Sequence, residues 1–491
     1  MDNVREIEFR SYGATELHPI VLVFTVAMCV LVVRSKRSHA ILPLMLISVL
    51  VTHAQRIVVL DLDFSMQRIV IIAALLRALV KGELRSLRPL TLDGFVVAWV
   101  VSAIFMGFAR DPSMSTLVNR LGFSVDSLGM YLAARCFIRA PVEVLASVRM
   151  LAWILLPLSL AMIYEHITAR NLFDFMGAKA IAGVRDGSTR SQGTLGHPIL
   201  AGSFGASAVP LMIALFLARS RERVSAVVGG LSALAVAMTT ASSGPAICLL
   251  AGLGAWSLWF VRRFTREILV GSAAMVIVIH LIREKPVWHL IGRLSELIGG
   301  TGYHRVRLID AWVANFDDWW LRGTKNTMYW GWGLQDTTNW FVANSVDGGL
   351  LTLVAFVAML VVSFRVIGHA RRARRRISAG SPLTSREFEY LTWGMGASLF
   401  AHCLAWISVS YFGTMKLIFF LELALLAGIA APLRERHRRA DRRLSAASKA
   451  VPRRRAARES QPASPLAAPD PGTSALKGLL AERRGEDRSQ L

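Results

Sequence analysis

The sequence predicts an all-α, polytopic membrane protein with about thirteen transmembrane helices and two large loops on the outer side. Hydrophobic residues make up 54% of the 491 residues and charged residues only 18%, too few to cover the outside of a soluble protein. The apolar residues come in blocks of roughly 17 to 22, the length that an α-helix needs to cross about 30 Å of hydrocarbon. Basic residues gather in alternate links between these blocks, as they do between membrane spans.

The candidate spans are apolar on all sides, so lipid is their expected neighbour. The third block is short and contains Arg77, which indicates a tilted or re-entrant segment. The blocks cover roughly residues 17–33, 40–60, 67–80, 92–109, 122–138, 146–164, 197–217, 224–239, 243–261, 267–283, 342–364, 390–410 and 415–432.

Lysine and arginine mark one side of the membrane. The basic links follow odd-numbered spans, so they share a side, which the positive-inside rule makes the cytoplasm. The N-terminus is then on the outer side of the membrane and the C-terminus on the cytoplasmic side. The long connections 165–196 and 284–341 both face outward. The residues behind this assignment are Arg34, Lys36, Arg37, Lys81, Arg85, Arg88, Arg219, Arg221, Arg223, Arg262, Arg263, Arg266, Arg371, Arg372, Arg374, Arg375 and Arg376.

The chain divides by composition into a membrane domain, residues 1–432, and a tail, residues 433–491. The tail is rich in Arg, Ala, Ser and Pro without an apolar period, which predicts a disordered cytoplasmic extension. A net charge of +23 would by itself suggest nucleic-acid binding. The topology explains the basic residues better, so no nucleic-acid partner is expected.

The cysteines predict neither a disulfide nor a metal site. Each lies within an apolar block, none forms a CxxC pair, and we interpret them as small buried hydrophobic residues. They are Cys29, Cys136, Cys248 and Cys403. Asp2, Glu6 and Glu8 give the first residues the wrong charge for a cleavable signal peptide.

The first outer loop has Arg185 and Arg190 in a Gly- and Ser-rich segment just before a span. Guanidinium groups there suit a phosphate or pyrophosphate, because two N–H donors match two oxygens. The glycines let backbone N–H groups approach the same anion. The alternative is that these arginines reach lipid headgroups. His197 begins the next span, either as a hydrogen-bonded helix-start residue, which we favour, or as part of the site.

The second outer loop is rich in tryptophan. Interface anchoring is the expected role for most of these side chains, and stacking on sugar rings is the alternative. They are Trp288, Trp312, Trp319, Trp320, Trp330, Trp332 and Trp340.

Polar residues are interleaved with these tryptophans: Tyr303, His304, Arg305, Arg307 and Asp310. Helical spacing puts Arg307 on one face with both Tyr303 and Asp310, so a structural ion pair with Asp310 competes with a role in binding.

A further acid, Asp336, and Asn339 lie in WGLQDTTNW, just before a span. Asp336 either acts as a base on a sugar hydroxyl or caps the helix that begins near Asn339. The short outer link TTASSGP, residues 239–245, either packs under the site or forms a plain turn.

Together these segments resemble the O-antigen ligase and O-antigen polymerase superfamily of bacterial membrane glycosyltransferases, over roughly residues 20–432. Each motif is weak alone, and it is their order, spacing and outer location that make the resemblance. The segments that match are RSQGTLGHPILAG, TTASSGP, YHRVRLIDAW and GWGLQDTTNWFVANSVDGGLLTLVAF.

The resemblance implies a donor, an undecaprenyl-pyrophosphate-linked glycan, and a reaction that needs no metal or cofactor. Family members transfer the glycan to lipid A core, to another glycan or to a protein. By position, Arg190 resembles the first-loop arginine that holds the pyrophosphate, and Arg305 or Arg307 the second-loop one. Membrane lipids and a glycan or lipid-linked acceptor are the other implied partners.

The chain departs from the family pattern at two places. Many members have Ser-Arg-Gly where this chain has Ser242, Ser243 and Gly244, and ligases often have His-Asn where it has Thr338 and Asn339. The nearest acid is Asp336 and the nearest loop histidines are His304 and His289. These differences favour a polymerase or specialised exopolysaccharide chemistry over a ligase with a histidine base.

The leading hypothesis is glycan transfer at the outer face. Arg185, Arg190, Arg305 and Arg307 would stabilise the leaving pyrophosphate, Asn339 would bind substrate, and Asp336 or His304 would accept the hydroxyl proton. The lipid tail would lie in a groove between spans. The alternatives are a transporter or flippase of lipid-linked saccharides, and a non-catalytic component of a polysaccharide-export complex that uses its basic tail.

Overall fold

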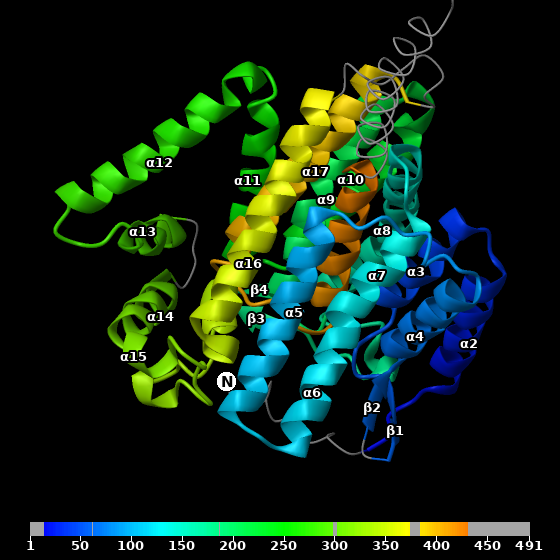
Figure 1. The fold of residues 1–491 in the computed structure, drawn as a ribbon, viewed down its shortest axis with the longest axis horizontal. Helices are drawn as coiled ribbons and strands as arrows, with labels where there is room; N and C mark the ends of the chain where they lie inside the picture. Colours follow the sequence, from blue (N-terminus) through cyan, green and yellow to red (C-terminus); the bar gives the residue numbers. More distant parts are fainter. Residues whose placement is uncertain (1–13, 61, 186, 298–301, 374–382, 431–491) are drawn as a thin grey trace, which may run out of the picture. The chain divides into compact units, whose positions relative to one another are not determined.

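The computed structural model describes residues 14–60, 62–185, 187–297, 302–373 and 383–430, and these are mostly helical (Figure 1). They belong to a unit that spans Met1–Arg434. The predicted disordered tail, residues 433–491, lies outside the described residues.

Most helices overlap a predicted span, while α6 and the short helices of the second outer loop lie largely between predicted spans. They are α2 (Pro19–Arg34), α3 (Ile41–Leu50), α4 (Met66–Val80), α5 (Thr91–Arg110), α6 (Met114–Ser124), α7 (Met130–Phe137), α8 (Pro141–Thr168), α9 (Pro198–Ala218), α10 (Arg223–Met238), α11 (Ser243–Ser257), α12 (Thr265–Ile282), α13 (His289–Leu297), α14 (Gly302–Ala314), α15 (Phe316–Trp319), α16 (Trp340–Ala373), α17 (Ser385–Ala405) and a last helix, Gly413–Ala430.

Among the described residues, six helices are long and apolar enough to cross a membrane. They begin and end at Thr91–Arg110, Pro141–Thr168, Pro198–Ala218, Arg262–Ile282, Trp340–Arg372 and Gly413–Ala430. A helical membrane protein is therefore the architecture that the structure supports, while the count of about thirteen spans stays a prediction.

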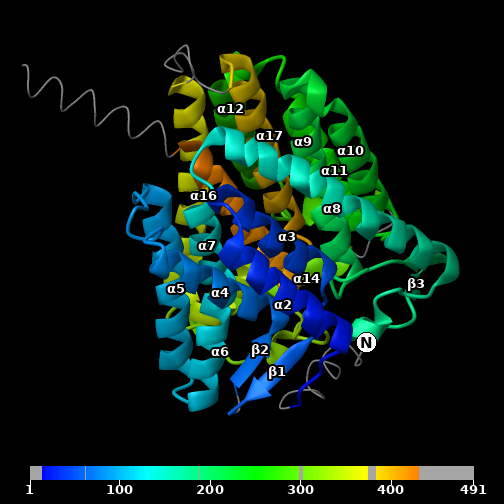
Figure 2. The ribbon, with the colours of Figure 1, turned by 90° about the vertical axis from the view of Figure 1, so that its right-hand side faces the viewer.

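Helix α9 lies at the centre of the bundle and packs against α10, α11 and α17. Small residues allow this close approach, as is usual between membrane helices. A Cβ added at Gly205 would lie 2.5 Å from the carbonyl oxygen of Ala233 on α10. Helices α2, α3 and α4 pack on one another on the side of the bundle away from α12 (Figures 1 and 2).

The second predicted span, 40–60, is wrong in its second half. Helix α3 ends at Leu50, and strand β1 (Arg56–Val59) pairs antiparallel with strand β2 (Leu62–Ser65). Polar residues end the apolar run after Leu50, and the β-branched residues that follow fit a strand better than a helix. Leu60, with φ 51°, lies in the left-handed region at the turn of this hairpin.

Helix α16 is broken at residues 348–349, where Gly349 has φ 67°. The break leaves backbone groups that need partners from the protein, since hydrocarbon offers none. The carbonyl oxygen of Val346 accepts from the backbone N–H of Thr324 (3.0 Å) and from the guanidinium of Arg110 (2.7 Å). The second outer loop and the end of α5 thus stabilise the break together.

Several loop tryptophans pack inside the protein, so interface anchoring is wrong for them. Trp319 is 2% exposed and stacks on Trp312 with ring centroids 4.9 Å apart. Trp340 is buried among other aromatic rings, including Trp406 at 4.9 Å. Trp332, at 88% exposed, is the kind of side chain that fits an interface.

Ion pairs and hydrogen bonds join the links at each end of the bundle. At the end predicted to be cytoplasmic, the ion pairs are Arg37–Glu143 (2.5 Å), Arg219–Glu387 (2.7 Å) and Arg262–Glu389 (3.1 Å). At the other end, the contacts are Ser191 with Thr239 (3.1 Å), Lys325 with Asp111 (3.1 Å) and Ser410 with Thr337. Each of these contacts joins links that the alternation of basic residues assigns to the same side of the membrane.

A reporter enzyme that folds only outside the cytoplasm tests which end is which. We expect activity when it is fused after Trp320 and none when it is fused after Arg221, because basic links stay on the cytoplasmic side. The measurement is reporter activity at matched protein level. The reverse pattern would overturn the predicted orientation.

Candidate functional site

A small hairpin in the first outer loop presents the two predicted arginines. Strand β3 (Gly183–Arg185) pairs antiparallel with strand β4 (Ser188–Arg190), with Arg185 opposite Ser188 and Gly183 opposite Arg190. Opposed residues and alternate residues of a strand share a face. Arg185 and Arg190 therefore project from the same face of the hairpin.

Arg190 is oriented by a hydroxyl group. Its Nε and Nη2 atoms donate to Oγ of Ser242, at 3.3 and 2.7 Å. Within the described part of the chain, no carboxylate pairs with Arg190. Burial, and then the charge of Arg185, lowers the pKa of the Arg190 guanidinium. Arginine nevertheless stays charged at neutral pH, so its positive charge is positioned without being neutralised.

Arg305 joins this cluster from the second outer loop. It lies on α14 and is only 6% exposed. Burial is the main cause that lowers its pKa, and the charge of Arg185 lowers it further. Arg185 of the first outer loop therefore lies within electrostatic reach of both Arg190 and Arg305.

The side chain of Arg307 lies against Tyr303. Its Cζ atom lies 5.7 Å from the centre of the exposed Tyr303 ring, a cation–π contact. The predicted ion pair with Asp310 is absent among the described contacts. Asp310 instead accepts from Nε1 of Trp288 at 2.7 Å and lies 3.2 Å from Nε2 of His289.

His197 stands at the start of α9, beside Arg190. Its Nδ1 accepts from the backbone N–H of Ile199 at 3.1 Å, so the favoured helix-start role is present. Burial, and then the charge of Arg190, lowers the pKa of His197 to about 4. The imidazole is thus neutral at pH 7, with its hydrogen on Nε2, where it can donate to an anionic oxygen.

Two helix N-termini face this cluster as well. Ser242, which binds Arg190, is the residue before α11, and His197 is the residue before α9. The N-terminus of a helix has free backbone N–H groups and a positive dipole end, both of which favour an anion. Positive charge therefore gathers around Arg190, next to the N-termini of α9 and α11.

Glu165, near the end of α8, fixes the loop between β4 and α9 through hydrogen bonds. Its buried carboxylate accepts from the backbone N–H groups of Gln192 (3.1 Å) and Gly193 (2.9 Å). Gly193 has φ +56°, and a Cβ there would lie 3.1 Å from Met162, so glycine fits this position. Asn171 donates to the carbonyl of Gly193 at 3.0 Å.

The second predicted group lies on and beside α14. Nε2 of His304 is 3.3 Å from the backbone carbonyl oxygen of Asp336. The Asp336 side chain is exposed. Asn339 caps α16, since its side-chain oxygen accepts from the backbone N–H groups of Phe341 (2.9 Å) and Val342 (3.3 Å). Asn339 therefore has the helix-cap role that was considered for Asp336, and it was expected to bind substrate instead.

The loop motifs did not predict the role of Glu165, whereas His197 has the helix-start role that was favoured for it. An acid at the end of an otherwise apolar span is the signal that singles out Glu165. The hydroxyl-rich link TTASSGP was expected to pack under the site or form a turn, and Ser242 lies directly against Arg190.

No protein-family model matches this chain. No curated protein matches it either. The resemblance to O-antigen ligases and polymerases therefore rests on the motifs alone, and the function that follows from it is a proposal.

Replacing Glu165 with Gln should loosen the site. The amide keeps one acceptor oxygen but turns an NH₂ group toward a backbone N–H, at a cost of about 1–3 kcal/mol of folding free energy. The measurement is thermal unfolding of the purified protein together with proteolysis of loop 165–196. The exposed Glu284→Gln is the control, and an equal effect of both variants would contradict this role.

The stability of the protein should fall in acid partly through His197. Because its folded pKa lies below its usual value of 6.5, its contribution is complete above pH 6.5 and is lost as the pH falls toward 4. His197→Asn keeps a helix cap that does not titrate. We expect thermal unfolding of this variant to depend less on pH between about 7 and about 5 than that of the wild type. Parallel curves would contradict the prediction.

Proposed function

We propose that this protein is a membrane glycosyltransferase of the O-antigen ligase or polymerase type. It acts on polyprenyl-pyrophosphate-linked glycans at the outer face of the bacterial inner membrane, in surface polysaccharide biosynthesis. One observation supports this most directly: Arg190 lies beside the N-termini of α9 and α11, and Arg185 lies within electrostatic reach of both Arg190 and Arg305.

Pyrophosphate fits this cluster better than a lipid headgroup does. An arginine that only reaches toward headgroups is expected to stay exposed and mobile. Arg305 is instead buried, and Arg190 is fixed by Ser242. Bringing like charges together is unfavourable unless an anion binds between them, and a pyrophosphate has enough oxygens to accept from several guanidinium groups.

In the proposed reaction, an acceptor sugar hydroxyl attacks the anomeric carbon of the donor. The bond from that carbon to the pyrophosphate oxygen breaks, and the arginines stabilise the negative charge that develops on the leaving group. The hydroxyl proton goes to Asp336 or His304. If Nε2 of His304 donates to the Asp336 carbonyl, its Nδ1 has the free lone pair that a base needs.

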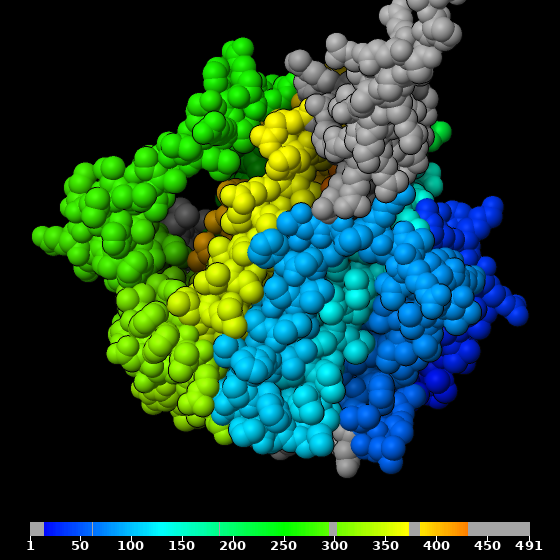
Figure 3. All heavy atoms as spheres, viewed as in Figure 1, coloured from blue at the N-terminus to red at the C-terminus, as the bar shows by residue number. Residues whose placement is uncertain are grey.

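The polyprenyl tail needs an apolar surface next to the site. Helix α12 has no buried residue, and a hollow separates it from α16 on the face shown in Figure 3. Lipid is the natural contact of such a surface. We propose that the tail of the donor lies along this side of the bundle.

The orientation belongs to the same proposal. The N-terminus is periplasmic and the C-terminus cytoplasmic, so both site loops meet substrate outside. The donor, the glycan or lipid-linked acceptor and membrane lipids are the partners, and no metal or cofactor takes part.

A transporter or flippase of lipid-linked saccharides is the second candidate. The observation that favours it is the presence of charged groups within helices, which transporters use near the bilayer midplane. Glu422, in the middle of the helix Gly413–Ala430, lies 2.9 Å from the fully buried His402 of α17. Purified protein in detergent with a short-chain donor separates the two, since only a transferase forms product without a membrane.

Replacing Arg190 or Arg305 with Lys should reduce activity nearly as much as replacement with Ala. The planar guanidinium fork binds two oxygens at once, and a lysine ammonium cannot. A charge-assisted contact of about 1.5–3 kcal/mol corresponds to roughly a ten- to hundred-fold loss of rate. The measurement is glycan product in cells that contain each variant at matched protein level.

Arg322 is the matched control, because it is exposed in the same outer loop as Arg305. Its Lys and Ala variants should keep most of the activity. Full activity of both Arg190→Lys and Arg305→Lys would remove these residues from the site.

A further inference from the structure

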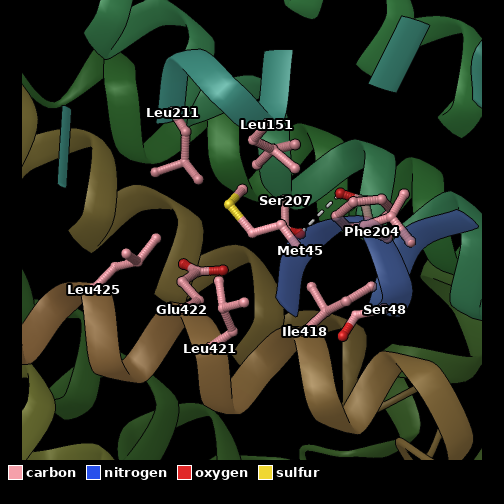
Figure 4. Close-up of a pocket in the computed structure, with 12 residues that line it drawn as sticks. Met45, Ser48, Leu151, Phe204, Ser207, Leu211, Ile418, Leu421, Glu422 and Leu425 are labelled. Atoms are coloured by element: carbon pink, nitrogen blue, oxygen red, sulfur yellow. Dashed lines mark hydrogen bonds between the residues drawn. The ribbon is translucent and has the colours of Figure 1, made fainter. Parts of the chain in front are cut away.

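A small cavity lies inside the helix bundle, apart from the arginine cluster. Its volume is about 30 Å³, and α3, α8, α9 and the helix Gly413–Ala430 line it (Figure 4). Its wall is apolar except for Ser48, Ser207 and Glu422. Glu422 is the one titratable group among the residues that line it.

Glu422 directs an oxygen into this buried space. The residue is only 9% exposed, and its Oε1 atom is buried without a hydrogen-bond partner among the described residues. Oγ of Ser48 is also buried without a hydrogen-bond partner among the described residues. Unpaired polar atoms in an apolar interior are unfavourable, so an occupant that bonds both is expected.

The other carboxylate oxygen belongs to a hydrogen-bonded chain. Oε2 of Glu422 lies 2.9 Å from Nε2 of the fully buried His402, and Nδ1 of His402 lies 2.7 Å from the hydroxyl of Tyr411. Cys248 of α11 and Cys403 of α17 are the other titratable groups that act on this chain.

The volume of the cavity and the oxygen atoms that line it determine what it can hold. A space of 30 Å³ admits water and excludes any organic ligand. Ca²⁺ or Mg²⁺ would need about six oxygen ligands or more, and the lining side chains offer those of Glu422, Ser48 and Ser207. Water fits this volume, and it can both donate to a carboxylate oxygen and accept from a serine hydroxyl.

We propose that Glu422 and His402 form a proton-binding site inside the bundle, which exchanges its proton through water in the cavity beside Ser48. A proton that arrives on the cavity water passes to Oε1 of Glu422, where an O–H bond forms and the water is regenerated. Ionisable groups inside membrane helices are commonly proton sites of this kind.

The site connects with the outer cluster through the loop between α17 and the last helix. Tyr411 of this loop binds His402, and the next residue, Phe412, packs against His197 with ring centroids 6.5 Å apart. A Cβ at Gly244, two residues after Ser242, would lie 3.2 Å from Ser408 of the same loop. The Glu422–His402 pair is therefore connected, through the loop after α17, with His197 and Gly244 near Arg190.

Infrared difference spectroscopy of the full-length protein in lipid nanodiscs tests the proposal without any glycan. When the pH is lowered, we expect a protonated carboxyl band to appear, and Glu422→Gln should remove it. Ser48→Ala should shift this band, because it removes one hydrogen bond to the occupant. Glu284→Gln, at an exposed position, should leave it unchanged.

A spectrum in which Glu422→Gln removes no carboxyl band would overturn the proposal, since the pair is then a fixed ion pair. If that variant does not fold, Ser48→Ala decides, and an unshifted band rejects exchange through the cavity. Repeating the titration in sodium and in choline salts tests the metal alternative: a Glu422-dependent band that sodium abolishes at constant pH would make this a sodium site.

Discussion

The carboxylate of Glu165 is the interaction on which the outer site depends. Loop 191–197 has no helix or strand. Residues 191–195 are buried, so their backbone N–H groups need partners from the protein. Glu165 accepts two of them, from Gln192 and Gly193. This fixes the segment between Arg190, which ends β4, and His197, which begins α9. A side chain at the end of a membrane helix thus sets the positions of two groups that face the anion.

Positive charge gathers around Arg190 in the outer site. Burial, and then the charge of Arg185, lowers the pKa of both Arg190 and Arg305. The protein orients Arg190 through the neutral hydroxyl of Ser242, and the N-termini of α9 and α11 next to it add further positive potential. On the proposed function, the pyrophosphate of the donor would offset this positive charge.

Composition and charge alternation predicted the helical membrane architecture and the grouping of links at two ends, because both follow from single-residue properties. The β1–β2 hairpin was missed, since hydropathy alone does not separate a strand from half a span. The choice between Arg305 and Arg307 depends on which side of α14 meets the first loop, and long-range packing decides that. Likewise His402 and Glu422 lie 20 residues apart in apolar segments, and only the bundle brings them together.

The structure shows the surroundings of the two positions where the chain departs from the pattern of the family that it resembles. Ser243 stands where many members have an arginine, so the cluster holds one charge fewer, and the preceding Ser242 positions the Arg190 that remains. Thr338 stands where ligases have a histidine, and its hydroxyl is buried without a partner among the described residues.

On the proposed function, the base that accepts the hydroxyl proton would then come from another element. His304 lies on α14, one residue before the buried Arg305, and its ring touches the Asp336 backbone. A base and a phosphate-binding arginine on one helix would keep a fixed separation, which suits an enzyme that repeats the same transfer along a growing glycan.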